Sequence, residues 1–326
     1  MRFYTQQHKF YCGIDLHTKN MFVCILDAGG NVRVHQNIHT NPEAFLHTIA
    51  PFREDIVVAV ECMFTWYWIA DLCVDQNIPF VLGHALYMKA IHGGKAKSDK
   101  IDSLKIATLL RGGMLPQAYL YPRKMRSTRD LLRRRNHLMR KRAELFAHIQ
   151  NTRNQYNPPD PLGCIAKPKN REGIVQRFDD PSVQKSMSVD LEVIEAYDHI
   201  LTQPERDIIA CAKEHHMTSY ALLQTIPGVG RILGLVLLYE IESIERFPQV
   251  QDFVSYCRLI KSIKESNGKK YGSSGKKIGN AHLKWAFSEA AVLFLKGNEP
   301  GKKYPHQRLA HKHGKAKALS ILAHPV

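Results

Sequence analysis

Residues 9–16, KFYCGIDL, predict a short β-strand that ends beside an acidic residue, Asp15. Residues 55–62, DIVVAVEC, form a continuous apolar run that closes with a second acid, Glu61. Such a run is typical of a strand that is buried on both faces of a sheet. The two stretches therefore predict a sheet whose strand ends carry carboxylates.

The surrounding sequence alternates between strand and helix patterns. Further strands are expected at 21–27, 31–39 and 78–83, with helices at 42–52, 65–76 and 99–110. Three meandering strands followed by alternating helix and strand indicate an α/β domain over residues 1–118.

Four acids form the candidate site. Asp99 and Asp102, in KSDKIDSLK, are spaced i, i+3 and share one face at a helix start. With Asp15 and Glu61 they are expected to provide the oxygen ligands that a pair of Mg²⁺ ions requires. Two such ions roughly 4 Å apart can activate a nucleophile and stabilise the leaving oxygen in phosphodiester chemistry. Taken alone, Asp15 could be a turn residue and Asp99 a helix cap, whereas an acid that ends a buried strand needs a partner. The ordered set reproduces the layout of ribonuclease-H-like nucleases.

The charge of the chain is concentrated in two segments. The formal net charge is +16, and residues 121–157 hold eleven Lys and Arg against two acids. Residues 261–326 hold fourteen against three, so the remainder is mildly acidic. This distribution indicates a polyanion partner, nucleic acid first of all. The seven cysteines form no CxxC pair, which argues against a zinc ribbon, and free reduced thiols are expected. No signal peptide or membrane span is predicted.

Residues 123–155 lack Pro and Gly and predict one long basic helix. After a loop at 158–180, a second helix is expected at 186–216, and the two would form an antiparallel hairpin or coiled coil. Two basic triplets, residues 133–135 and 140–142, recur at about seven residues on one side of the first helix. They predict phosphate contacts, with a solvated helix face as the alternative.

The last third is expected to be helical, with helices at 231–241, 248–260 and 280–296. The turn IPGVG at 226–230 places Gly228 and Gly230 before an apolar helix, where backbone amides can approach a phosphate. A packing corner between helices is the alternative. Residues 265–279 are expected to be a loop rich in Gly, Ser and Lys. On composition, Ser266, Ser273 and Ser274 compete there as nucleophiles.

Together these motifs resemble a known family. The order GID (13–15), VE (60–61), SDKID (98–102), IPGVG (226–230) and GN-x-x-LK-x-x-F (279–287) is similar to that of the DEDD transposases of bacterial insertion sequences and the related Piv-like invertases. The resemblance implies a RuvC-like domain (1–118), a coiled-coil region (119–217) and an all-α transposase domain (218–326).

The resemblance also implies roles. Asp15, Glu61, Asp99 and Asp102 match the family's metal-binding acids, with Mg²⁺ as the ion and Mn²⁺ as a possible substitute. The family's catalytic serine lies forty residues after the start of IPGxG, which here is Ser266, although Asn267 separates it from Gly268. That serine would form a transient phosphoserine link to DNA, in a site that brings both domains together. If the loop register differs, Ser273 or Ser274 takes this role.

The partners implied are donor and target DNA, a guide or bridge RNA, and further copies of the chain as a homodimer or homotetramer, in a bacterial cytoplasm. A structure-selective endonuclease of the Holliday-junction type, which uses only the metal site, is the alternative enzyme. A third reading is a nucleic-acid-binding protein with a degenerate site. The residues expected to bind nucleic acid are Arg133, Arg134, Arg135, Arg140, Lys141, Arg142, Gly228, Gly230, Lys269, Lys270, Lys276, Lys277 and Lys284.

Overall fold

The structure is a computed structural model. It describes residues 2–91, 98–158, 163–260, 262–274, 278–296, 298–301, 303, 307–314, 318–319, 321 and 323. The chain divides into two compact units, Met1–Arg123 and Lys124–Val326. The expected domain boundaries near residues 118 and 217 stay a prediction.

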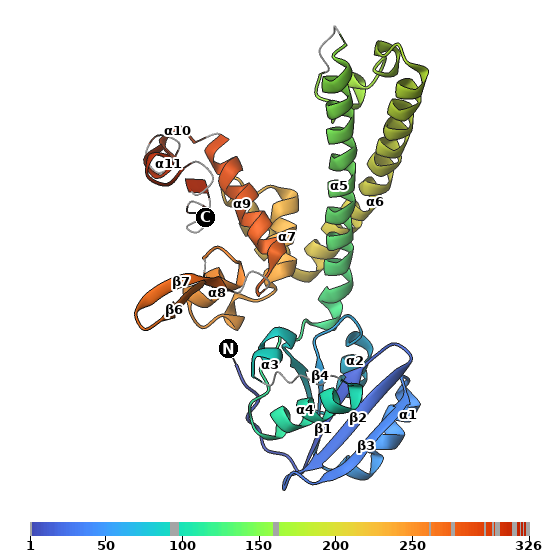
Figure 1. The fold of residues 1–326 in the computed structure, drawn as a ribbon, viewed down its shortest axis with the longest axis vertical. Helices are drawn as coiled ribbons and strands as arrows, with labels where there is room; N and C mark the ends of the chain where they lie inside the picture. The colour runs from blue at the N-terminus through green and yellow to red at the C-terminus, as the bar shows by residue number, and fades with distance from the viewer. Residues whose placement is uncertain are drawn as a thin grey trace. The chain divides into compact units, whose positions relative to one another are not determined.

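The first unit is built on a five-stranded mixed sheet (Figure 1). Its strands are β1 (Phe10–Leu16), β2 (Asn20–Asp27), β3 (Val32–His39), β4 (Ile56–Glu61) and β5 (Phe80–Gly83). The strand order is β3-β2-β1-β4-β5. The first three strands pair antiparallel as a meander, and β4 and β5 join β1 in parallel. The two central strands therefore end at the same edge of the sheet.

Helices cover both faces of this sheet, because alternate residues of each strand point to opposite sides. Cys12 and Ile14 of β1 pack with α1 (Pro42–Ile49) and α2 (Tyr67–Asp75). Tyr11 of β1, with Val57 and Ala59 of β4, packs with α3 (Ala85–Ile91) and α4 (Asp99–Arg111). By this alternation Asp15 and Glu61 belong to the face that α4 covers.

Helix α4 lies directly on β1 at Gly13. A Cβ atom at Gly13 would lie 2.3 Å from the Ala107 nitrogen and 2.5 Å from the Ser103 oxygen. Both of these atoms belong to the backbone, which cannot yield as a side chain does. Glycine is therefore required at this position for sheet and helix to approach so closely.

The second unit is mainly helical. Its long helices are α5 (Arg123–Tyr156, which begins at the last residue of the first unit) and α6 (Pro181–Thr225), followed by α7 (Arg231–Ile241), α8 (Val250–Tyr256), α9 (Ala281–Lys296), α10 (Glu299–Gly301) and α11 (Gln307–His313). Short 3-10 turns lie at Ala50–Phe52 in the first unit and at Pro168–Asn170, Val175–Arg177 and Ile244–Arg246 in the second. Helix α6 covers the helix expected at 186–216 and continues to Thr225, and His216 breaks its backbone geometry with φ −154° and ψ 62°.

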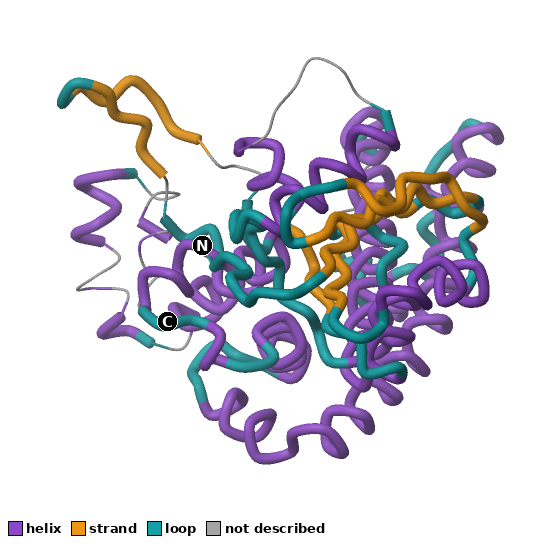
Figure 2. Tube along the Cα trace, turned by 90° about the horizontal axis from the view of Figure 1, so that it is seen from below, coloured by secondary structure: helices purple, strands orange, loops and turns teal. Residues whose placement is uncertain are grey.

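A two-stranded hairpin stands where a loop was expected at 265–279. Strands β6 (Ser262–Ser266) and β7 (Lys269–Ser274) pair antiparallel around Asn267 and Gly268 (Figure 2). Both turn residues have positive φ, 48° and 72°. This is the requirement of a type I′ turn, which Asn-Gly favours, and the expectation of a loop was wrong because it overlooked this dipeptide. Lys276 and Lys277 lie outside the described residues.

The fold class is confirmed as a mixed five-stranded sheet with helices, followed by a helical region that contains the one hairpin just described. All seven cysteines are free thiols, and Cys62 and Cys164 are exposed. Among the described helices, none is long and apolar enough to cross a membrane.

Candidate functional site

The first candidate site lies at the shared edge of β1 and β4. Ile14 pairs with Val60 in parallel register, so Asp15 and Glu61 are the next residues on neighbouring strands. Helix α4 begins at Asp99 after the Ser98 cap, whose hydroxyl accepts a hydrogen bond from the Ile101 amide. Asp15 and Glu61 therefore lie on the sheet face that α4 covers, and Asp99 and Asp102 lie in the first turn of α4.

Within the described residues, the closest group of possible metal ligands comprises Asp15, His17 and Asp99. One ligand atom from each lies within 4.8 Å of the others. His17 Nε2 is 3.4 Å from Asp15 Oδ2 and 3.6 Å from Asp99 Oδ1. Asp102, whose Oδ1 accepts a hydrogen bond from Lys105 Nζ at 3.3 Å, and Glu61 are not members of this group.

The electrostatics of Asp15 favour a bound cation. Its side chain is 17% exposed. Burial raises the pKa of Asp15, the charges of Asp99 and Asp102 raise it further, and His17 opposes them. A half-buried carboxylate beside two like charges is stabilised by a positive ion. The donor set of carboxylate oxygens and one imidazole nitrogen fits a divalent metal.

The second candidate site is the tip of the β6–β7 hairpin. Ser266 is exposed and is the last residue before the Asn-Gly turn, directly opposite Lys269. Glu265 pairs with Lys270 in the same register, and the register shifts only beyond this pair, so that Lys264 pairs with Gly272. The fold thus presents a serine at a turn, with Lys269 directly across from it and Lys270 one residue further along β7.

Two family models match this chain. Residues 12–158 match a model of DEDD transposases of the IS110 type, described as "Transposase", and contain all four acids. Residues 220–306 match the model described as "Transposase IS116/IS110/IS902 family" and contain the hairpin. The chain belongs to the IS110/IS116/IS902 family of transposases. It is therefore an enzyme that cuts DNA and transfers strands. No curated protein matches the chain.

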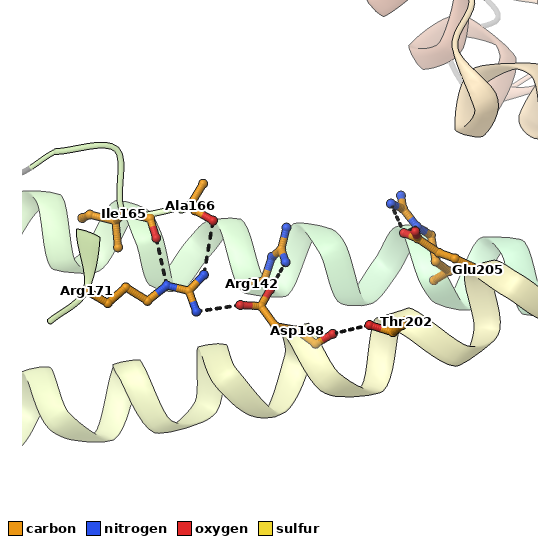
Figure 3. A network of polar contacts seen from close by, with 8 residues as sticks. Arg142, Ile165, Ala166, Arg171, Asp198, Thr202 and Glu205 are labelled. Atoms are coloured by element: carbon orange, nitrogen blue, oxygen red, sulfur yellow. Dashed lines mark hydrogen bonds and ion pairs between the residues drawn. The ribbon is translucent and has the colours of Figure 1, made fainter. Parts of the chain in front are cut away.

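In this transposase the basic residues of α5 that were predicted to bind nucleic acid fall into two groups, those paired with carboxylates of other helices and those that are exposed. Arg135 and Arg142 do not point freely into solvent, because they pair with carboxylates of α6. Figure 3 shows Arg142 and Arg171 on either side of Asp198. Arg135 Nε donates to Glu205 at 2.7 Å, and Arg142 shares Asp198 with Arg171, whose Nη1 donates at 2.6 Å. The pairs run in opposite directions along the two helices, which makes α5 and α6 antiparallel.

Arg133 also has a partner inside the second unit. Its Nε and Nη2 donate to the two carboxylate oxygens of Glu240 on α7 at 2.6 and 2.7 Å. Glu240 is 1% exposed and also accepts a hydrogen bond at 2.8 Å from Asn280, which caps α9 by accepting from the His282 amide. Three of the six triplet residues, Arg133, Arg135 and Arg142, therefore form ion pairs with other helices of the second unit.

The remaining basic residues of the triplets are exposed. Arg134 is exposed, Arg140 donates to the Asn136 carbonyl, and Lys141 pairs with Glu144 on its own helix. Lys284, in the first turn of α9, is exposed as well. These four side chains stay candidates for nucleic-acid contact.

The two glycines of IPGVG have different surroundings in the transposase. Gly228 has φ +90°, and a Cβ there would lie 2.4 Å from the Ala290 carbonyl oxygen of α9. Gly228 thus has the features of a packing corner. Gly230 precedes α7 without a side-chain cap and has no atom within 4 Å of a built Cβ. Of the two, Gly230 retains the open backbone that a phosphate contact requires.

Sequence reasoning missed His17. It follows Asp15 by two residues, and the period of a strand predicts that both point to the same side. That spacing was a usable signal in GIDLHTK.

Proposed function

We propose that this transposase cuts and rejoins DNA with Mg²⁺ held by Asp15, Glu61, Asp99 and Asp102, and with Ser266 as its nucleophile. The convergence of Asp15 and Asp99, from elements far apart in the sequence, is the observation that carries the metal half. Carboxylate oxygens are the ligands that Mg²⁺ prefers, and two ions are proposed, with Mn²⁺ able to substitute. When bound, the metal activates the attacking oxygen and stabilises the leaving oxygen.

Ser266 is proposed to attack a DNA phosphate. A bond forms between Ser266 Oγ and phosphorus, the bond from phosphorus to the deoxyribose oxygen breaks, and the serine proton ends on that leaving oxygen. The reverse reaction with another DNA hydroxyl reseals the strand. Lys269 and Lys270 supply positive charge to the phosphate, and the exposed position of Ser266 at a turn supports access. Ser273 and Ser274, on the opposite strand, remain the alternative nucleophiles.

We also propose a guide RNA and an oligomer of the chain. The two basic segments support an RNA partner as well as donor and target DNA. Strand transfer between two DNA ends supports a homodimer or homotetramer. A coiled coil of α5 and α6 is proposed because Met187, Ile194, Leu201 and Ile208 are buried at intervals of seven residues.

The serine half is tested by trapping a covalent protein–DNA adduct with the full-length enzyme and Mg²⁺. Wild type and Ser273→Ala should form the adduct and Ser266→Ala should not. Loss of the adduct in Ser273→Ala and its retention in Ser266→Ala would assign the nucleophile to the opposite strand. Metal-dependent cutting that survives Ser266→Ala without any adduct would instead indicate a structure-selective endonuclease.

The metal ligands and the guide RNA need separate tests. Asp15→Asn should abolish cutting at all Mg²⁺ concentrations while DNA binding persists. RNA that copurifies with the transposase should be required for sequence-specific cutting, and nuclease treatment followed by add-back should remove and restore it. Specific cutting by RNA-free protein would exclude guidance.

A further inference from the structure

A pocket adjoins the proposed metal site. Its volume is about 430 Å³, within the range of roughly 300–1,000 Å³ that holds small organic ligands. His17 belongs both to the metal-ligand group and to the pocket wall. The lining residues are His17, Thr18, Thr40, Pro42, Thr65 and Trp68.

Two hydrogen bonds connect the walls of this pocket to the strand that carries Asp15. Thr65 Oγ1 donates to the Leu16 carbonyl at 3.2 Å, and Thr40 Oγ1 donates to the His17 carbonyl at 2.9 Å. The pocket is therefore held beside the end of β1, and His17 is the residue that it shares with the metal-ligand group.

The chemistry of the lining selects against charged ligands. Among its described residues none is Lys, Arg, Asp or Glu, and His17 is the one titratable member. Pro42 and the half-buried Trp68 offer apolar surface, while the threonine hydroxyl oxygens can still accept hydrogen bonds. Such a lining suits a flat, uncharged group with a few polar atoms, and a nucleobase has this character.

An exposed aromatic residue is adjacent in sequence to the pocket wall. The segment between Glu61 and Trp66 carries Phe64, which is 80% exposed, and Met63, which is 52% exposed. Phe64 directly precedes Thr65 of the pocket wall. Aromatic side chains presented to solvent beside a nucleic-acid site are characteristic stacking surfaces for unpaired bases.

We propose that this pocket binds one unstacked base of the DNA strand being cut, with Trp68 inside the pocket and Phe64 at its rim as stacking surfaces. The proposal rests on the proposed function, because the metal site is what brings a DNA phosphate beside His17. Enzymes that hold a base outside the duplex read it by stacking and by a few hydrogen bonds, as this lining permits.

The test compares binding of two short DNA duplexes to the full-length protein. One duplex is fully paired, and the other contains a single unpaired 2-aminopurine, a fluorescent base whose emission changes on stacking. Ca²⁺ is present because it binds the same oxygen ligands. Wild type should prefer the unpaired duplex by about tenfold, within the range that one base–aromatic stack contributes, with a change in emission.

The variants isolate the two stacking surfaces. Trp68→Ala and Phe64→Ala should each reduce the preference severalfold and leave affinity for the paired duplex unchanged, whereas Trp68→Phe should retain it. Val74→Ala, at another exposed apolar residue of α2, is the control. Because Phe64 is so exposed, Phe64→Ala remains informative if Trp68→Ala does not fold.

Two outcomes overturn the inference: no preference for the unpaired base in wild type, or a preference that neither stacking variant reduces. Either result leaves the proposed function intact if Asp15→Asn still abolishes cutting. Loss of metal dependence would reject the proposed function instead, so the two failures are distinguishable.

Discussion

Asp15 carries a charge that its surroundings disfavour. Because its pKa is raised by burial and by Asp99 and Asp102, ionisation at neutral pH costs the folded state stability. We therefore expect Asp15→Asn to raise the midpoint of thermal unfolding in EDTA. Mg²⁺ at 100 times its dissociation constant should stabilise wild type by about 2.7 kcal/mol and leave Asp15→Asn unchanged. Equal Mg²⁺ stabilisation of both proteins would contradict a ligand role.

Glu240 presents the opposite case. Burial alone raises its pKa, but Arg133 and the Asn280 hydrogen bond outweigh burial and hold the pKa below its ordinary value of 4.5. The carboxylate therefore contributes stability above pH 4.5, and this contribution is lost as pH falls through the lowered folded-state pKa. Glu240→Gln should cost about 1–3 kcal/mol at pH 7, because the remaining Arg133 side chain is 37% exposed and can be hydrated.

Urea unfolding at pH 7 and in acid measures this effect, and the gap between wild type and Glu240→Gln should narrow as the pH falls. Glu144→Gln, at an exposed pair, should change the free energy of unfolding by about 0–1 kcal/mol. A gap that is independent of pH would refute the charged pair.

Only some residues of this site can be recognised from the sequence. Asp15, Glu61 and Asp99 are visible because each ends or begins an element. His17 was overlooked because a lone histidine has many roles. The pairing of Arg135 and Arg142 was hidden, because their partners on α6 lie far along the chain.

At the scale of elements, ion pairs fix the register of α5 against α6. Glu205→Arg should place two cations together and lower the free energy of unfolding by about 1–3 kcal/mol. Combining it with Arg135→Glu restores opposite charges, so the double variant should recover most of the loss. If the double variant loses as much free energy of unfolding as the two single variants lose together, the helices pair differently. Asp207→Asn, on the exposed side of α6, is the control.

The hairpin that carries Ser266 depends on its turn. Gly268 has φ +72° and no neighbour within 4 Å of a built Cβ, so Gly268→Val introduces backbone strain without a clash. That strain is about 1–2 kcal/mol. Covalent adduct formation should fall while global stability and DNA affinity persist, whereas Asn267→Gly should retain activity. Normal adduct yield in Gly268→Val would show that hairpin geometry is dispensable.

Most elements could be predicted from the sequence, because their patterns are local. The apolar run before Glu61 located β4 within one residue. The Asn41 cap and Pro42 at the first position located the start of α1, and the expected last turn at 50–52 is a 3-10 helix. The hairpin was missed because its strands are polar and show no alternation, although Asn267-Gly268 marks the turn. The break at His216 has no local signal that we recognise.

At the scale of the whole molecule, the net charge of +16 overstates the number of cations that can contact a partner, because several arginines already pair with carboxylates of the chain. Arg134→Gln should lower the slope of log affinity against log salt by about 1, because an exposed cation is lost from the phosphate contact. Arg135→Gln should leave that slope unchanged and reduce stability. Fluorescence anisotropy with a duplex of arbitrary sequence between 50 and 200 mM salt gives both slopes. Equal slopes for Arg134→Gln and wild type would remove Arg134 from the interface.

The contact at Gly13 has a consequence for how this enzyme can be inactivated. Helix α4 carries two of the proposed ligands and lies on the strand that carries a third, with no room between them for one methyl group. An alanine at residue 13 would act as a spacer that lifts the helix from the strand. Such an allele would encode a folded protein in which every proposed ligand is present but the spacing of the bound ions is altered. A comparison of the site residues alone would not detect this defect.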